Sequence, residues 1–245
     1  MKIITLTTDF GLSDSYVAQM KGVILSEEPN YNIVDISHQI PAQNILEGAI
    51  VLKEAAEQFP KESTHIAVVD PGVGSKRRAL LIKTHNGKTF IGPDNGLLSL
   101  AAKKEDRKEV WEISIPDDSS NTFHGRDVFG KAAVGNAKLK ETEQEIIEIE
   151  IPAPMIKGDE ISGEIIRFDS FGNAISNIKL EKAPSKVLLK DRELELVENY
   201  DSITSEIAAL IGSQGYLEIS SKNTSTKESL KVGDKIVTVK RDASI

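Results

Sequence analysis

Side chains able to bind and move protons gather around one glycine-rich stretch of the sequence. Asp70 ends an apolar run that begins at Ile66, and the Pro-Gly-Val-Gly sequence after it cannot continue a strand. Lys76, Arg77 and Arg78 follow directly. Because open α/β sheets bind ligands beyond the carboxyl ends of their strands, an acid, a glycine loop and basic side chains indicate a site there. An ordinary strand-to-loop turn with solvated charges explains the same residues equally well.

A second acid has the same setting near the start of the sequence. The β-branched run 3–8 predicts a strand that ends before Asp9, and a glycine turn follows. A helix is expected over residues 16–28, with Ser13 or Asp14 as its N-cap. Two acids at the ends of two strands strengthen the case for a site at one edge of the sheet.

A histidine with polar neighbours precedes another expected helix, over residues 128–137. His124 lies in the sequence Thr-Phe-His-Gly-Arg-Asp, which ends at Asp127. Polar side chains beside a glycine at a helix N-terminus favour anions and carboxylates. A loop histidine is more often a plain hydrogen-bonding residue than a catalyst, but this one has an arginine and an aspartate beside it.

The elements that must position these side chains alternate between strands and helices, which predicts right-handed βαβ crossovers and a mainly parallel sheet. Further strands are expected at residues 32–37, 64–70 and 109–115, helices at 44–58 and 97–103, and a hairpin joining 79–84 to 88–91 through Asn86 and Gly87.

The composition changes near the Ile-Pro-Ala-Pro sequence at residues 151–154, which favours an extended connection between domains. We therefore predict an α/β fold in which an N-terminal domain, residues 1–152, precedes a small C-terminal β-barrel-like domain, residues 158–245. Short strands are expected at 160–168, 174–178, 186–189, 193–196, 215–220 and 235–240, and a helix at 203–211.

Two loops of this second domain carry polar side chains. Asp169, Phe171 and Asn173 could form a polar pocket with an aromatic wall, although a plain hairpin turn uses the same residue types. The loop at residues 220–225 includes Ser221 and Lys222, and its composition alone favours a solvated loop.

Bulk composition narrows the classes of partner and chemistry. The formal net charge of -8 argues against nucleic-acid and anionic-membrane partners, which require excess lysine and arginine. Without cysteine there is no disulfide, thiolate catalysis or Cys-ligated metal. No segment approaches the ~20 apolar residues of a membrane span, and no signal peptide is recognisable, so we expect a cytoplasmic protein.

Five motifs in a fixed order carry a resemblance to a known family: TTDFG, VVDPGVGSKRR, GPDNG, FHGRD and FDSFGN. In this order and at these intervals the chain resembles the S-adenosylmethionine (SAM) hydroxide adenosyltransferases, or SAM hydrolases, which are similar to fluorinase and chlorinase. The resemblance implies an N-terminal α/β domain, a C-terminal β-barrel-like domain, and a homotrimer with sites at subunit interfaces. It also implies that water displaces L-methionine from C5′ of SAM and leaves adenosine, without metal or cofactor.

The resemblance assigns roles to particular residues. Asp70, Arg77 and His124 match the catalytic triad near the water, and Asp9 matches the residue that holds the ribose diol. Fluorinase has a serine at the position of Gly125, so glycine there favours water over halide. Fluorinase has a tryptophan where this chain has Ile175, so the methionine end is not identical. The substrate-binding set implied is Asp9, Asp14, Ser15, Tyr16, Gly125, Asp169, Phe171, Asn173, Ser221 and Lys222.

The chemistry of a sulfonium fits such a site. Its sulfur leaves as a neutral thioether, so no general acid is required. One oriented water suffices, in line with the C5′–S bond and roughly 3 Å from the carbon. Asp70 can accept from that water, while Arg77 and His124 favour its hydroxide form.

Two alternatives remain at this level. Asp9, Asp70, Asp94, His124 and Asp127 could instead bind Mg²⁺, Mn²⁺ or Zn²⁺ in a metal-dependent phosphoesterase. The chain could also bind adenosine without turnover, through Asp9 and the C-terminal loops, with Asp70 merely structural.

Overall fold

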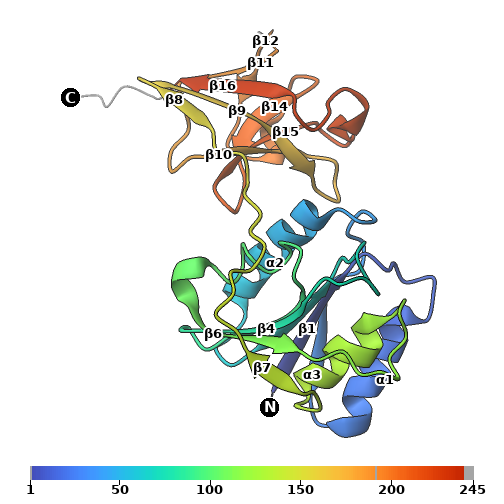
Figure 1. Ribbon diagram of the computed structural model, residues 1–245. Coiled ribbons are helices and arrows are strands. Elements are labelled where there is room, and N and C mark those ends of the chain that lie inside the picture. Colours follow the sequence, from blue (N-terminus) through green and yellow to red (C-terminus); the bar gives the residue numbers. More distant parts are fainter. Residues whose placement is uncertain (1, 191, 240–245) are drawn as a thin grey trace. The chain divides into compact units, whose positions relative to one another are not determined.

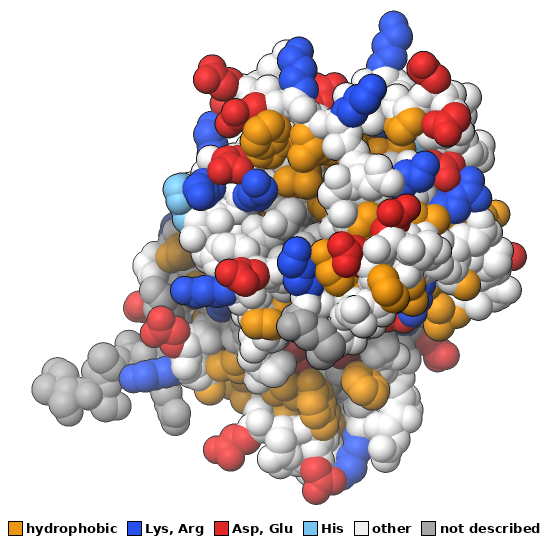
Figure 2. Space-filling model, turned by 90° about the horizontal axis from the view of Figure 1, so that it is seen from below, with side chains coloured by type: hydrophobic (Ala, Val, Ile, Leu, Met, Phe, Trp, Pro, Cys, Tyr) orange, Lys and Arg blue, Asp and Glu red, His pale blue; other side chains and the backbone are white. Residues whose placement is uncertain are grey.

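The computed structural model describes residues 2–190 and 192–239, and the chain divides between residues 150 and 151 into two compact units. Residues 240–245, which the sequence analysis assigned to the C-terminal domain and to the end of its last strand, lie outside the described residues. None of the described helices is long and apolar enough to cross a membrane. On the face drawn in Figure 2, basic and acidic side chains are interspersed, as the acidic but mixed composition leads one to expect.

A seven-stranded mixed sheet forms the first unit (Figure 1). Its spatial order is β2-β1-β3-β5-β4-β6-β7, parallel from β2 to β5 and antiparallel from β5 to β7. The α/β fold class is thus confirmed, with antiparallel strands on one side of the parallel set. The strands are β1 (Ile3–Thr8), β2 (Asn32–Ser37), β3 (Thr64–Val68), β4 (Ala79–Thr84), β5 (Thr89–Pro93), β6 (Arg107–Ile113) and β7 (Leu139–Glu141).

Helices cover both faces of this sheet and bury a separate core on each (Figure 1). On one face Met20 and Ile24 of α1 pack with Phe129, and on the other Leu52 of α2 packs with Phe90. The helical segments are α1 (Tyr16–Glu27), α2 (Ile45–Gln58), a 3-10 turn (Lys104–Asp106), a π-helix (Gly125–Gly130) and α3 (Lys131–Ala133).

The second unit is built on a nine-stranded sheet that nearly closes into a barrel, which confirms the predicted β-barrel-like fold. Its spatial order is β12-β11-β16-β9-β10-β15-β14-β13, and β8 pairs with β9. The strands are β8 (Met155–Lys157), β9 (Glu160–Phe168), β10 (Ala174–Lys179), β11 (Lys186–Leu189), β12 (Arg192–Glu193), β13 (Glu195–Leu196), β14 (Ala208–Ile211), β15 (Tyr216–Ser220) and β16 (Lys235–Val239). Two 3-10 turns, Tyr200–Ser202 and Thr226–Glu228, complete the described part of it.

Three expected helices differ from the structure. The apolar segment 203–211 ends in strand β14, because a short buried apolar run fits a strand beside β15 as well as a helix. Residues 97–103 form turns, since a segment this short follows its tertiary packing. The helix expected at 128–137 begins earlier, as a π-helix at residue 125, and is shorter.

Candidate active site

A fork of hydrogen bonds joins Asp70 to Arg77 at the carboxyl end of β3. The Arg77 Nε atom donates to both carboxylate oxygens, at 3.1 and 3.0 Å, and Nη2 lies 2.5 Å from Oδ2. The side chains of Asp70 and Arg77 are only 4% and 9% exposed. Arg77 also lies over the ring of Phe129, with Cζ 5.3 Å from its centroid. The guanidinium is therefore fixed in place by a carboxylate and an aromatic face together.

His124 completes this cluster from the residue before the π-helix. Its Nδ1 atom lies 2.8 Å from Arg77 Nη2, and its side chain is almost fully buried. Burial lowers the pKa of His124 below its usual 6.5, and the positive charge of Arg77 lowers it further. The histidine is therefore neutral at pH 7. Its Nε2 atom is buried without a hydrogen-bond partner among the described residues.

A close backbone approach holds the two loops of this cluster together. Gly74 has φ +74°, and a Cβ atom there would lie 2.3 Å from the carbonyl oxygen of Asn121. Only glycine fits both the dihedral angle and the contact. The loop after β3 can therefore lie against the segment that carries His124.

A cavity of about 170 Å³ lies in front of this cluster. Four predicted site residues line it: Asp9, Asp70, His124 and Gly125. Arg77 is not among the lining residues, although it hydrogen-bonds to both Asp70 and His124. Further walls come from residues that the sequence analysis did not single out, namely Phe10, Gln43, Val68, Pro71, Val73, Thr122 and Phe123.

Asp9 is held by Gln43, whose backbone N–H donates to Oδ2 at 2.9 Å. Gln43 has φ +64°, an uncommon conformation for a residue other than glycine. Because the contact comes from the backbone, no feature of the Gln43 side chain in the sequence could have predicted it.

The start of α1 differs from its expected form. The N-cap residue is Ser15 rather than Ser13 or Asp14, and its side chain accepts a hydrogen bond from Gln19 without capping the helix. Tyr16 packs edge-on against Phe123, 5.2 Å between ring centroids, and so lies close to a wall of the cavity. Asp14, Ser15 and Tyr16 do not line the cavity.

The remaining predicted residues belong to the second unit. Asp169 accepts hydrogen bonds from the backbone N–H groups of Phe171 and Asn173 and from the Asn173 side chain, at 2.8 to 2.9 Å. This turn leaves Phe171 81% exposed. Ser221 donates to the carbonyl of Glu206, and Lys222 donates to the carbonyl of Asp201.

Three of the four acids considered as metal ligands pair with arginines: Asp70 with Arg77, as described above, and Asp94 and Asp127 with two others. Asp94 accepts from Arg78 Nε at 2.8 Å, and Asp127 accepts from Arg126 Nε at 2.6 Å. Within the described ranges, no three His, Asp or Glu side chains gather closely enough to hold a metal ion.

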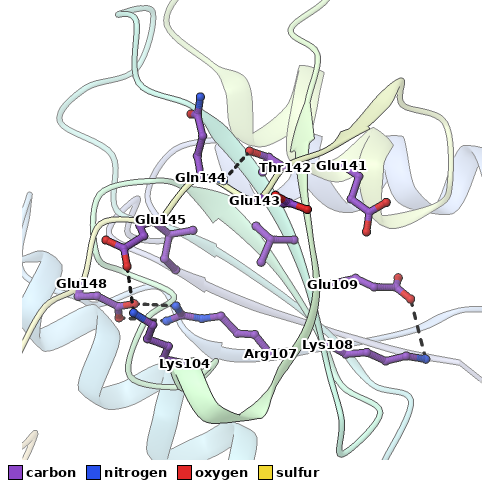
Figure 3. A pocket seen from close by; sticks show the side chains of 12 residues that line it. Lys104, Arg107, Lys108, Glu109, Glu141, Thr142, Glu143, Gln144, Glu145 and Glu148 are labelled. Carbon is purple, nitrogen blue, oxygen red and sulfur yellow. Dashed lines mark hydrogen bonds and ion pairs between the residues drawn. The ribbon is translucent and has the colours of Figure 1, made fainter.

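A larger cavity of the first unit, about 340 Å³, lies between residues 104–110 and 141–148 (Figure 3). Two ion pairs lie at this cavity: Arg107 contacts Glu148 at 2.6 Å, and Lys104 contacts Glu145 at 3.0 Å. None of the predicted site residues lines this cavity.

Comparison with known proteins places these motifs in one family. Residues 4–146 match the SAM hydroxide adenosyltransferase N-terminal domain, and residues 163–237 match the C-terminal domain. The (R)-S-adenosyl-L-methionine hydrolase of Methanocaldococcus jannaschii is 40% identical over 240 residues, which cover 90% of this chain and 88% of that protein. The enzyme of the same name from Thermus thermophilus is 32% identical, over 94% of this chain and 96% of that protein.

The fold has a match among solved structures as well. The crystal structure of an uncharacterized conserved protein from Thermotoga maritima covers 98% of this chain and 100% of that chain, with a TM-score of 0.85 and 26% sequence identity. Both domain matches and the relatives over most of the chain agree with the ordered motifs. The chain therefore belongs to the SAM hydroxide adenosyltransferase family.

Proposed function

We propose that this chain hydrolyses S-adenosyl-L-methionine to adenosine and L-methionine. Water attacks C5′ and forms the C5′–O bond, while the C5′–S bond breaks and its electron pair stays on sulfur as a neutral thioether. The water loses one proton in the process. Family membership and the names of its relatives support the reaction, and the observation that carries it is the Asp70–Arg77–His124 cluster facing a cavity that Asp9 also lines.

Asp70 is the proton acceptor in this proposal. It lines the cavity, and its Oδ1 atom, which accepts one bond from Arg77 where Oδ2 accepts two, keeps lone-pair capacity for the water. The guanidinium keeps the carboxylate in one orientation, and an oriented acceptor is worth ~10²–10⁴ in rate.

His124 acts as a donor rather than a base. Arginine can only donate, so the Nδ1 atom facing Arg77 accepts, and the neutral ring carries its proton on Nε2. A water in the cavity can accept from Nε2–H while it gives its own proton toward Asp70. The nearby charge of Arg77 further stabilises hydroxide character.

Asp9 holds the ribose. A carboxylate can accept from two hydroxyl groups at once; Oδ2 is oriented by Gln43, and Oδ1 accepts no hydrogen bond from the described residues. Gly125 leaves the wall of the cavity without a side chain. Fluorinase has a serine at this position, so glycine favours water over halide as the nucleophile.

We further propose a homotrimer in which a neighbouring copy completes each site. The cavity, at about 170 Å³, is smaller than the roughly 300 Å³ of ordinary ligand pockets. The exposed Phe171 and its loop, with Asp169, Asn173, Ser221 and Lys222, would supply the walls for methionine and adenine. Mixing subunits of Asp70→Ala and Asp169→Ala should restore activity if two copies share a site, and should not if each copy works alone. Cytoplasmic residence remains a prediction of the sequence.

The test of the reaction is product analysis in H₂¹⁸O. Attack at C5′ places the label in the 5′-hydroxyl of adenosine and none in methionine. Asp70→Ala and His124→Ala should lower the rate by at least about 10², whereas the control Lys76→Ala, an exposed neighbour, should not. Excess chelator separates this reaction from metal-dependent hydrolysis, since full activity is expected in its presence. Wild-type protein that released no adenosine would contradict the proposal.

A further inference from the structure

The backbone that carries Asp9 is held by the segment after the neighbouring strand. We call residues 8–11 the Asp9 turn. Strands β1 and β2 are parallel, so their carboxyl ends meet at one edge, and their register shifts between Leu6 and Thr7. The Gly11 N–H donates to the carbonyl of His38 at 2.8 Å, and the Ile40 N–H donates to the carbonyl of Thr8 at 3.4 Å. The Asp9 turn is therefore tied to residues 38–40 on both sides of its acid.

The side chain of His38 adds a third tie. It is 2% exposed, and its Nδ1 atom lies 2.8 Å from Thr8 Oγ1, which also accepts from the Phe10 N–H at 3.2 Å. The hydroxyl of Thr8 thus joins the imidazole to the backbone on the far side of Asp9.

The other edge of the imidazole faces an ion pair. The Nε2 atom of His38 lies 3.1 Å from Asp35 Oδ1 without good hydrogen-bond geometry, and Asp35 Oδ2 lies 2.6 Å from Lys21 Nζ. The ring is therefore fixed between the Asp9 turn and the surface of α1 and β2.

We propose that His38 is a positioning residue for Asp9, acting through Thr8. The inference rests on the proposed function, in which Asp9 holds the ribose diol. His38 does not line the cavity, so in this proposal it acts on the ribose only through Asp9. A carboxylate that accepts from two hydroxyls must be held within about 0.5 Å and 10–20° of its productive geometry, and the three ties limit its movement.

Two pairs of variants separate the effect of the His38–Thr8 hydrogen bond from the effect of side-chain packing. In His38→Asn the side-chain amide reaches the place of Nδ1, whereas in His38→Gln it reaches the place of Nε2. Thr8→Val removes the hydroxyl at nearly constant volume, and Thr8→Ser keeps it. We expect His38→Gln and Thr8→Val to raise KM roughly tenfold with little change in kcat, and the two retaining variants to stay near wild type. Equal KM in all four variants would overturn the inference.

Binding of a ligand that lacks the ribose diol separates a positioning role of His38 from a purely structural one. Calorimetry measures binding of adenosine and of 2′,3′-dideoxyadenosine to wild type and to His38→Gln. The inference predicts a loss of affinity for adenosine but none for the dideoxy compound, since Asp9 has no hydroxyls to hold in the latter. An equal loss for both would mean that His38 only stabilises the fold and would overturn the inference. A wild type that releases no adenosine from SAM refutes the proposed function instead, whatever the variants do.

Discussion

Arg77 donates a hydrogen bond from Nη2 to Nδ1 of His124 at 2.8 Å, and the same guanidinium forks onto Asp70. Since arginine has no acceptor, this contact determines which imidazole nitrogen carries the proton. Arg77 therefore orients both the proton acceptor of the proposed reaction, Asp70, and its hydrogen-bond donor, His124.

Arg77→Lys tests this shared control. Lysine keeps the charge but has no planar fork, so it cannot hold Asp70 and His124 together. We expect kcat to fall by about 10²-fold, with the pH dependence of the remaining activity altered. Steady-state kinetics of Arg77→Lys and of Lys76→Arg, a matched change at the adjacent exposed position, provide the comparison. Wild-type kcat in Arg77→Lys would mean that positive charge alone is enough.

The pH profile follows from the lowered pKa of His124. Its folded-state pKa lies below 6.5, so the ring stays neutral above pH 6.5 and gains a proton only as the pH falls through a lower value. That proton would occupy Nδ1 and break the bond from Arg77. We expect kcat/KM to be flat with respect to this group above pH 6.5 and to decline below it. An acid limb centred above pH 6.5 would contradict the assignment.

How far the sequence predicts this site depends on the kind of contact. Asp9 and Asp70 were expected to meet because the carboxyl ends of parallel strands share an edge, and the structure places both on one cavity. His124 joins them through a loop whose position depends on the close approach of Gly74, which a motif can suggest but not locate. Gln43 contributes a backbone amide, which no side-chain pattern encodes.

Fold stability should depend on pH through His65. This ring bridges Thr5 and Ser63, at 2.8 and 2.9 Å, and stacks on Phe90. Burial, with a smaller contribution from the charge of Lys88, lowers its pKa from 6.5 to about 4. Between these values the unfolded chain binds more protons, so the free energy of unfolding should fall by up to about 3 kcal/mol as pH decreases through the window.

Urea unfolding above pH 6.5 and near pH 4 measures this dependence. His65→Gln should lower stability at the higher pH and weaken the pH dependence, because the titrating ring is gone. His85→Gln, at an exposed position, should keep the wild-type dependence. Parallel pH curves for wild type and His65→Gln would assign the effect to other groups.

Gly74→Ala should disturb the site and the fold together. A left-handed conformation costs alanine about 1 kcal/mol, and the contact with the Asn121 carbonyl adds a clash that the loop must relieve by moving. Gly135→Ala is the matched control, since Gly135 has φ +82° with open space around it. We expect Gly74→Ala to lower kcat and to lose more stability than Gly135→Ala. Equal losses in unfolding free energy would mean that the close approach carries no strain.

Substitution of Asp94 tests whether this acid is a structural partner of Arg78 or a ligand of a metal ion. Its Oδ2 atom pairs with Arg78, and Oδ1 accepts from the Ile147 N–H at 2.8 Å, while Arg78 also donates to the carbonyl of Glu145. The Asp94 side chain is 5% exposed, so Asp94→Ala leaves a half-buried guanidinium without its charge partner and should cost about 3–5 kcal/mol of stability.

Below the melting temperature of Asp94→Ala, kcat should stay close to wild type, because Asp94 does not line the cavity. Asp94→Asn is the companion variant, since its amide oxygen can still accept from the Ile147 N–H and should recover part of the stability. The opposite pattern, a large fall in kcat with little loss of stability and recovery on adding Mg²⁺, Mn²⁺ or Zn²⁺, would identify Asp94 as a metal ligand. Differential scanning calorimetry and turnover assays on the same samples decide between the two.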